Sequence, residues 1–170
     1  MIRTILFATD FSELSRRAER HAVELARALR ANLEIMHAIE PLAGFESGDE
    51  EMEAFTAELR ARCEQRMTEV AERVAREQVR VSSYLTIGSP WSAIVERAEA
   101  IGADLIVLGS HGLARQGRVY LGTTSHRVLF HTAVPVLIVR DLEEEEQEPA
   151  PGQVAVEVIG PGGDEVQPDR

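Results

Sequence analysis

Five segments of the sequence have the apolar, β-branched composition of buried strands, and apolar residues recur at helical spacing in the stretches between them. The predicted strands are residues 2–9, 33–39, 79–87, 105–108 and 135–139. Strands that alternate with helices predict an α/β fold, in which helices cover both faces of a parallel sheet. The 170 residues of the chain suit one domain with a substantial buried core.

The most economical arrangement is a five-stranded, doubly wound, Rossmann-like sheet of strand order 3-2-1-4-5. In this order the winding reverses between the first and the fourth strand, and ligands bind beyond the carboxyl ends of the strands at such a reversal. Asp10 ends the first strand and Gly109 ends the fourth. We therefore expect these two residues to border a binding site.

Several local signals predict where helices begin and end. Ser12 is placed to cap the first helix, and Asn32 marks its stop. Ser89 followed by Pro90 is typical of a helix start. Glu69 and Arg73 lie four residues apart on the second predicted helix, where they indicate a solvated, ion-paired face.

The segment from residue 109 to residue 125 is rich in glycine and ends in a Thr-Thr-Ser run. Glycine lets backbone N–H groups approach phosphate oxygens, and the helix that follows adds its unpaired N–H groups and the positive end of its dipole. The chain has no lysine, so this is not a Walker A loop, and the glycine spacing is not the dinucleotide fingerprint. A phosphate site is favoured over an ordinary connecting loop.

The same segment resembles a known family. Its pattern Gly109-x2-Gly112-x9-Gly122-Thr123 is similar to the G-2x-G-9x-G-(S/T) signature of the ATP-binding universal stress proteins. The sequence of residues 105–140 resembles the C-terminal half of that family, and residues 5–12 resemble its first strand and turn. The resemblance covers residues 1–140.

The resemblance implies a site for ATP, or another adenine nucleotide, with Mg²⁺ held mainly by phosphate oxygens. It places Asp10 at the sugar or at the metal–phosphate end, and the two alternatives stay open. The implied contacts to the base and ribose come from Ala8, Thr9, Asp10 and the backbone of Ala38. The implied contacts to the ribose and phosphates come from Leu108, Gly109, His111, Gly112, Gly122, Thr123, Thr124 and Ser125.

Two positions depart from the family pattern, because Ala8 stands where proline is frequent and Thr123 where serine is commoner. Neither change removes a group that the signature needs. Arg115 and Arg118 either reach phosphates or point to water. His111 has no carboxylate placed to orient it as an acid–base group, and we assign no catalytic residue.

The resemblance implies a nucleotide-responsive stress or signalling module. We expect at most slow ATP hydrolysis, because no Walker-type lysine, arginine finger or general base is evident. The alternative is an ATP-hydrolysing or nucleotidyl-transferring enzyme of the same α/β group. A nucleotide-free member of the family is disfavoured by the intact glycine pattern. The family typically forms homodimers through its last strand, here the residues from Pro135 to Val139.

Charge divides the chain into two parts. Residues 141–170 contain ten acids and one arginine, so they carry nine of the eleven net negative charges. The nearly neutral remainder shows no basic face, which argues against nucleic-acid binding. We predict a nucleotide-binding domain over residues 1–140 and an acidic, Pro/Gly-rich tail over residues 141–170. Disorder is favoured in the tail over an ordered arm, and the tail either binds a protein partner or aids solubility.

The cysteine content and the lengths of the apolar runs indicate the cellular compartment. The single cysteine, Cys63, falls on the apolar stripe of a predicted helix, where a buried structural thiol is expected. One cysteine excludes an internal disulfide and suits a reducing cytosol. Because no apolar run is long enough to span a bilayer and no signal-peptide pattern opens the chain, we expect a cytoplasmic protein.

Overall fold

The computed structural model describes residues 1–41, 50–110 and 121–140. The strands are β1 Thr4–Ala8, β2 Asn32–Ile39, β3 Arg80–Ile87, β4 Leu105–Gly109 and β5 Val136–Val139. The helices are α1 Glu13–Leu29, α2 Glu50–Ala75, α3 Pro90–Ala100 and α4 Thr123–His131. The predicted tail, residues 141–170, lies outside the described residues.

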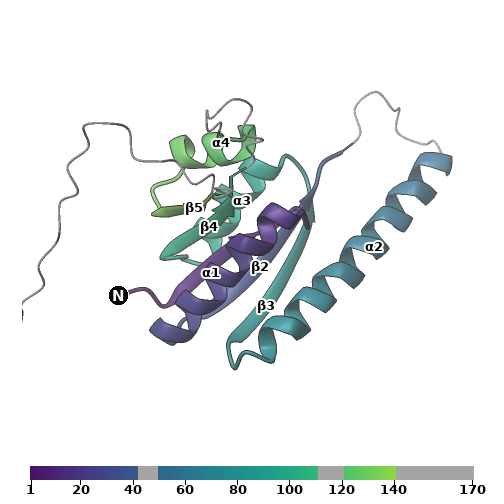
Figure 1. Cartoon of the computed structure of the whole chain (residues 1–170). Helices are drawn as coiled ribbons and strands as arrows, with labels where there is room; N and C mark the ends of the chain where they lie inside the picture. The colour runs from purple at the N-terminus through teal and green to yellow at the C-terminus, as the bar shows by residue number, and fades with distance from the viewer. Residues whose placement is uncertain (42–49, 111–120, 141–170) are drawn as a thin grey trace, which may run out of the picture.

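The five strands form one parallel sheet of order β3-β2-β1-β4-β5, which confirms the predicted fold class (Figure 1). The first strand lies at the centre, where Ala8 is opposite Met36 of β2 on one side and Leu108 of β4 on the other. The carboxyl ends of these three strands therefore meet at one edge of the sheet.

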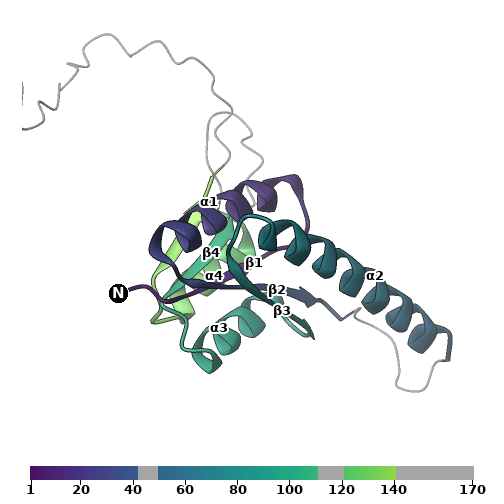
Figure 2. The same ribbon diagram turned by 90° about the horizontal axis from the view of Figure 1, so that it is seen from below.

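Alternate residues of β1 point into two separate cores, as the two-residue period of a strand requires. Ile5 and Phe7 pack with α1 and α2 on one face, and Leu6 packs with α3 and α4 on the other. All three side chains are fully buried. Seen from below, α1 and α2 lie on one side of the sheet and α3 on the other (Figure 2).

The helix ends follow the sequence signals in part. The Ser12 side chain accepts a hydrogen bond from the Ser15 N–H at 3.2 Å, which confirms the predicted cap of α1. Asn32 is not the stop of this helix, because Arg30 adopts the left-handed conformation (φ 54°) that ends it and Asn32 already belongs to β2. Ser89 precedes α3 as predicted, but its side chain makes no capping hydrogen bond.

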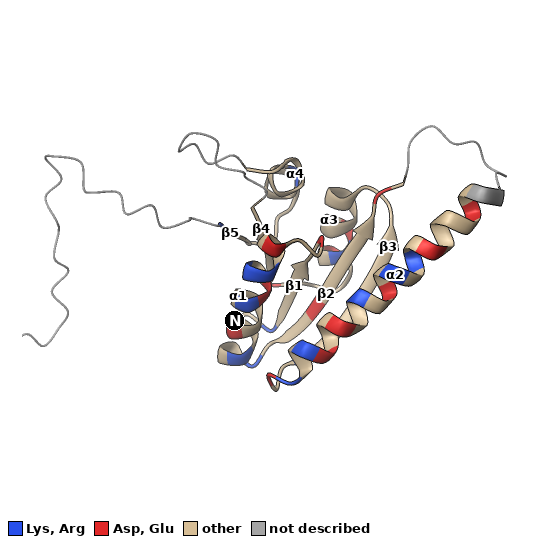
Figure 3. Ribbon diagram, turned by 45° about the vertical axis from the view of Figure 1, so that its right-hand side comes forward, with Lys and Arg blue, Asp and Glu red and all other residues tan. Residues whose placement is uncertain are grey.

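Arg73 is paired with a residue other than the predicted one. Its guanidinium donates two hydrogen bonds of 2.8 Å to the carboxylate of Glu19, and so joins α2 to α1. Glu69 instead accepts a hydrogen bond from Gln65. Sequence spacing shows only neighbours on the same helix, whereas packing brought a buried carboxylate from α1 within reach. The rest of α2 carries interspersed charges of both signs (Figure 3).

Two further features agree with the composition. Cys63 is buried, as expected, and burial raises the pKa of its thiol. Across the described ranges, none of the helices combines the length and the hydropathy that a bilayer-spanning segment needs.

Candidate functional site

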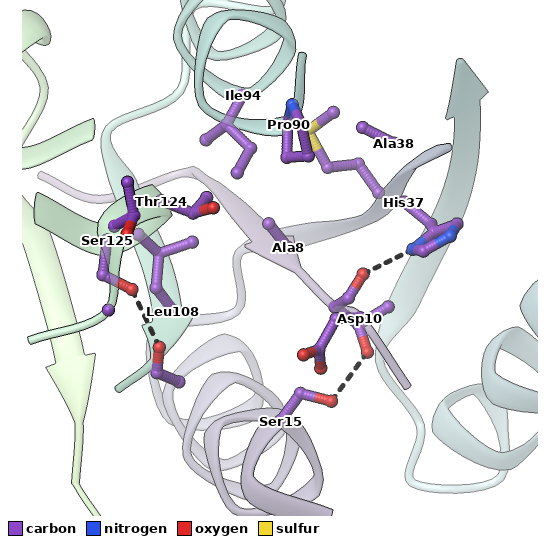
Figure 4. Close-up of a pocket in the computed structure, with 15 residues that line it drawn as sticks. Ala8, Asp10, Ser15, His37, Ala38, Pro90, Ile94, Leu108, Thr124 and Ser125 are labelled. Atoms are coloured by element: carbon purple, nitrogen blue, oxygen red, sulfur yellow. Dashed lines mark hydrogen bonds between the residues drawn. The ribbon is translucent and has the colours of Figure 1, made fainter. Parts of the chain in front are cut away.

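A cavity of about 420 Å³ opens at the carboxyl edge of the sheet, between β1, β2 and β4 and the first turns of α3 and α4. Its size falls in the range typical of small-molecule sites. Figure 4 shows the side chains that surround it. The lining residues are Ala8, Thr9, Asp10, Ser15, Met36, His37, Ala38, Pro90, Ile94, Leu108, Gly109, Gly122, Thr123, Thr124 and Ser125.

The cavity brings together the sequence-predicted residues that the structure describes. These are Ala8, Thr9, Asp10, Ala38, Leu108, Gly109, Gly122, Thr123, Thr124 and Ser125. The other two, His111 and Gly112, lie outside the described residues, as do Arg115 and Arg118. Segments separated by about a hundred positions in the chain thus meet because β1 and β4 are neighbours in the sheet.

Sequence reasoning missed five lining residues: Ser15, Met36, His37, Pro90 and Ile94. The strand order alone could have indicated His37, because β2 ends beside β1 at the same edge. Pro90 was predicted as a helix start but not as a site residue. To place Pro90 at the cavity, one needs to know which strands have their carboxyl ends beneath the first turn of α3. No local pattern in the sequence shows this.

The inner part of the cavity is apolar. Ala8, Met36, Ala38, Ile94 and Leu108 contribute carbon surface from three strands and α3. Met36 is fully buried, and Ile94 and Leu108 are nearly so. An apolar floor surrounded by a few polar groups suits a flat, weakly polar ring system whose edge polar atoms meet the backbone at the rim.

On the β1 side, hydroxyl groups satisfy one another. The Ser15 hydroxyl donates to the Ser12 carbonyl at 2.9 Å, so its oxygen accepts from the Thr9 hydroxyl at 3.0 Å. The Thr9 oxygen in turn accepts from the N–H of Phe11 at 3.0 Å. Each of these hydroxyl hydrogens is therefore used within the protein, and this wall holds its shape rather than offering donors to a ligand.

His37 joins the ends of β1 and β2. Its Nδ1 lies 2.8 Å from the Thr9 carbonyl oxygen, and because a carbonyl can only accept, Nδ1 carries the proton. Burial is the largest influence on the pKa of His37 and lowers it. The bond to Thr9 and the nearby Asp10 carboxylate oppose this shift, while Arg66 adds to it. The imidazole is therefore neutral at neutral pH, with its unprotonated nitrogen at Nε2.

On the opposite side, helix α4 begins at the cavity. Gly122 is its N-cap residue; within the described part of the chain no side chain caps the helix, and its first turn contains no acid. The Ser125 hydroxyl donates to the Gly109 carbonyl at 3.0 Å and so ties α4 to the end of β4. The early N–H groups of α4 and the positive end of its dipole are available to an anion.

Asp10 supplies the carboxylate of the cavity wall, and it lies across from Thr124 in Figure 4. One of its oxygens accepts the N–H of Ser12 at 2.9 Å. In residues 1–41, 50–110 and 121–140 no three His, Cys, Asp or Glu side chains are grouped in a way that could hold a metal ion. Any cation at this site would need most of its ligands from a bound molecule.

Comparison with known proteins gives a consistent result. The model of the universal stress protein family matches residues 1–140. The chain is 37% identical over 142 residues to a universal stress protein from Thermus aquaticus, with 82% of this chain and 100% of the relative covered.

Two solved structures share the fold. Protein MJ0577 of Methanocaldococcus jannaschii superposes with a TM-score of 0.73 at 26% identity, covering 84% of this chain and 98% of that one. A universal stress protein solved in complex with cAMP superposes with a TM-score of 0.58 at 27% identity, covering 82% and 97%.

Proposed function

The chain belongs to the universal stress protein family, and from this premise we propose that it binds an adenine nucleotide, above all ATP, in the cavity at the carboxyl edge of the sheet. Nucleotide occupancy would then report a cellular state to a stress-response partner. Support comes from the described residues of the family signature, Gly109, Gly122 and Thr123, which line the cavity, and from the cAMP complex of a relative.

The observation that carries this proposal is the start of α4. Its first N–H groups, which no side chain of the described residues caps, border a cavity whose opposite end is apolar. An amphipathic ligand with an anionic end and a flat ring system fits that division, and a nucleotide has both parts. In this placement the adenine lies on the apolar floor beside the backbone of Ala38, and the phosphates lie at Gly122, Thr123 and Thr124.

Ser125 contributes differently from the residues before it. Because its hydroxyl hydrogen is donated to Gly109, we assign it a backbone contact to phosphate rather than a side-chain contact. Mg²⁺ would be held mainly through phosphate oxygens, because the described residues offer no group of three ligands for it. Asp10 would accept hydrogen bonds from the ribose hydroxyls.

We expect hydrolysis to be slow at most. The titratable side chains in the described cavity wall are Asp10 and His37. His37 is held with its protonated nitrogen on the Thr9 carbonyl, so it orients the wall and is not placed by a carboxylate to activate water. We assign no catalytic residue.

Calorimetric titration of the full chain with ATP and Mg²⁺ tests the site. Gly122→Val should weaken binding at least tenfold, because a branched side chain at the N-cap obstructs the approach of phosphate to α4. Gly88→Val is the matched control, since a Cβ there meets no atom within 4 Å and Gly88 lies outside the cavity lining. Unchanged ATP affinity in Gly122→Val would place the nucleotide elsewhere.

The enzymatic alternative is tested on the same material. It requires steady-state turnover of ATP that Asp10→Ala abolishes while ATP still binds. Mass spectrometry of natively purified protein would identify the nucleotide that the chain carries from the cell.

We also propose a homodimer through β5. This strand lies at the edge of the sheet, its residues Val136–Val139 are half-buried, and an edge strand of apolar residues needs a cover. Phe130 on the neighbouring α4 leaves 71% of its surface exposed. Analytical ultracentrifugation over a range of concentrations should give the mass of two chains, and a monomer at every concentration would contradict this.

Finally, we propose that the nucleotide-binding domain ends near residue 140. A chain truncated there should bind ATP with the affinity of the full chain, because the cavity residues all precede that point. Lower affinity in the truncated chain would assign the acidic tail to the domain.

A further inference from the structure

Phe11 adopts a backbone conformation that is uncommon for a bulky residue. Its φ angle is 62°, in the left-handed region that favours glycine. The other described non-glycine residues with positive φ, Arg30 and Gln78, follow the ends of α1 and α2, where left-handed residues are common. Phe11 instead precedes a helix and lies next to Asp10, at the wall of the cavity.

Three contacts hold Phe11 in this conformation. Its N–H donates to the Thr9 hydroxyl at 3.0 Å. Its ring lies against the imidazole of His37, with centroids 4.3 Å apart. The guanidinium of Arg66, on α2, lies 4.7 Å from the centre of the same ring. Strained residues of this kind persist where surrounding contacts over-determine them, and such residues cluster at binding sites.

His37 touches the chain on both sides of Asp10. It donates to the carbonyl of Thr9, the residue before Asp10, and it packs on the ring of Phe11, the residue after it. Asp10 itself accepts the N–H of Ser12. The carboxylate is therefore carried on a short turn whose two flanking residues are both anchored to the end of β2.

We propose that Phe11 and His37 are positioning residues for Asp10, and that through it they make the site select ribonucleotides over 2′-deoxyribonucleotides. This inference rests on the proposed nucleotide function and names the sugar that the site prefers. A carboxylate discriminates a hydroxyl from a hydrogen only if its position is fixed, because the bond is short and directional. The turn anchored by Phe11 and His37 supplies that constraint.

The contacts indicate how to separate positioning from folding. Phe11→Gly keeps the left-handed backbone, which glycine adopts without strain, but removes the ring that His37 and Arg66 contact. Phe11→Tyr keeps the ring and should behave as the wild type. His37→Gln removes the ring contact from the other partner. Phe55→Ala is a matched control, because Phe55 is half exposed on α2 and does not line the cavity.

The experiment titrates each full-length protein with ATP and with 2′-deoxyATP in the presence of Mg²⁺, and compares the two dissociation constants. The wild type, Phe11→Tyr and Phe55→Ala should bind ATP about tenfold more tightly than 2′-deoxyATP, the effect of one charge-assisted hydrogen bond. In Asp10→Asn, Phe11→Gly and His37→Gln this ratio should fall towards one, because ATP loses more affinity than 2′-deoxyATP does.

A residue that only supports the fold would weaken both nucleotides equally and leave their ratio unchanged, and that result in Phe11→Gly and His37→Gln overturns the inference. A wild type that binds both nucleotides equally well overturns it too, while the proposed function stands. A wild type that binds neither refutes the proposed function. Thermal melts verify folding, and if Phe11→Gly does not fold, the ratio in His37→Gln decides.

Discussion

The two sides of the cavity are built differently, although they face each other across the same space. On the β1 side, Thr9 and Ser15 use their hydroxyl hydrogens on one another and on the backbone. On the α4 side, the helix begins at Gly122 without a side-chain cap in the described residues. A side whose donors are already satisfied can fix geometry, and a side with open donors can bind an anion. We infer that the fixed shape of the cavity and its donors to an anion are supplied by separate segments of the chain.

The two sides touch at Gly109, and a change there should have the largest effect. A Cβ at this position would lie 3.3 Å from the Leu14 carbonyl oxygen and 3.4 Å from the Cα of Ser15. Both are backbone atoms in the first turn of α1 and cannot rotate away. Gly109→Val should therefore push β4 from α1, lower the free energy of unfolding by about 1–3 kcal/mol and weaken ATP binding more than tenfold.

Chemical denaturation and calorimetry measure these two quantities. Gly88→Val is again the control, since nothing lies within 4 Å of a Cβ there. If Gly109→Val bound ATP normally, the two sides of the cavity would be structurally independent of each other.

Much of the fold followed from local signals in the sequence. Apolar runs located all five strands, and their alternation with helices indicated the order that the structure confirms. Contacts between elements did not follow, because they depend on packing. Arg73 pairs with Glu19 on another helix, and Arg30 ends α1 although arginine is not a residue that signals a left-handed cap.

The residues of the cavity also divide into those that a local pattern indicates and those that packing brings there. Glycine spacing and a hydroxyl run are patterns within one segment, so the residues of the α4 side could be named in advance. His37 and Ser15 line the cavity because β2 ends, and α1 begins, beside the carboxyl end of β1, and neither residue carries a local signal of that. The resemblance also implied a phosphate contact from Ser125, and no sequence pattern indicated that its hydroxyl donates to the Gly109 carbonyl.

On the β1 side, the removal of one hydroxyl should lower the stability of the fold more than it lowers the affinity for ATP. Thr9→Val keeps the shape of the side chain but leaves the Phe11 N–H without its acceptor and removes one partner of Ser15. Thr9 is buried, so we expect the free energy of unfolding to fall by about 1–3 kcal/mol. Thr68→Val, which removes an exposed hydroxyl bonded within α2, is the matched control. Equal denaturation midpoints for both variants would show that the network is not a constraint.

On the α4 side, the removal of one hydroxyl should have a smaller effect on the free energy of unfolding. Ser125→Ala removes the hydrogen bond to the Gly109 carbonyl, and one such bond contributes about 1 kcal/mol net. Because the N–H groups of α4 remain, ATP affinity should fall by less than about tenfold. Ser92→Ala, which removes an exposed hydroxyl bonded to Glu96, controls for the loss of a helical serine. A larger loss of affinity in Ser125→Ala would mean that its side chain contacts phosphate directly.

The smallest expected effect is a pH dependence that belongs to the β1 side alone. Among the described lining residues the α4 side has no titratable side chain, whereas the β1 side includes His37 and Asp10. Because burial lowers the pKa of His37 in the folded protein, the unfolded chain binds the proton more readily. This contribution to stability is fully present above the unfolded pKa of about 6.5 and is lost as the pH falls towards the lower folded pKa.

Denaturant titrations between about pH 5 and pH 8 should show this decline in the wild type and a shallower one in His37→Asn. An identical slope in both proteins would assign the decline to other groups.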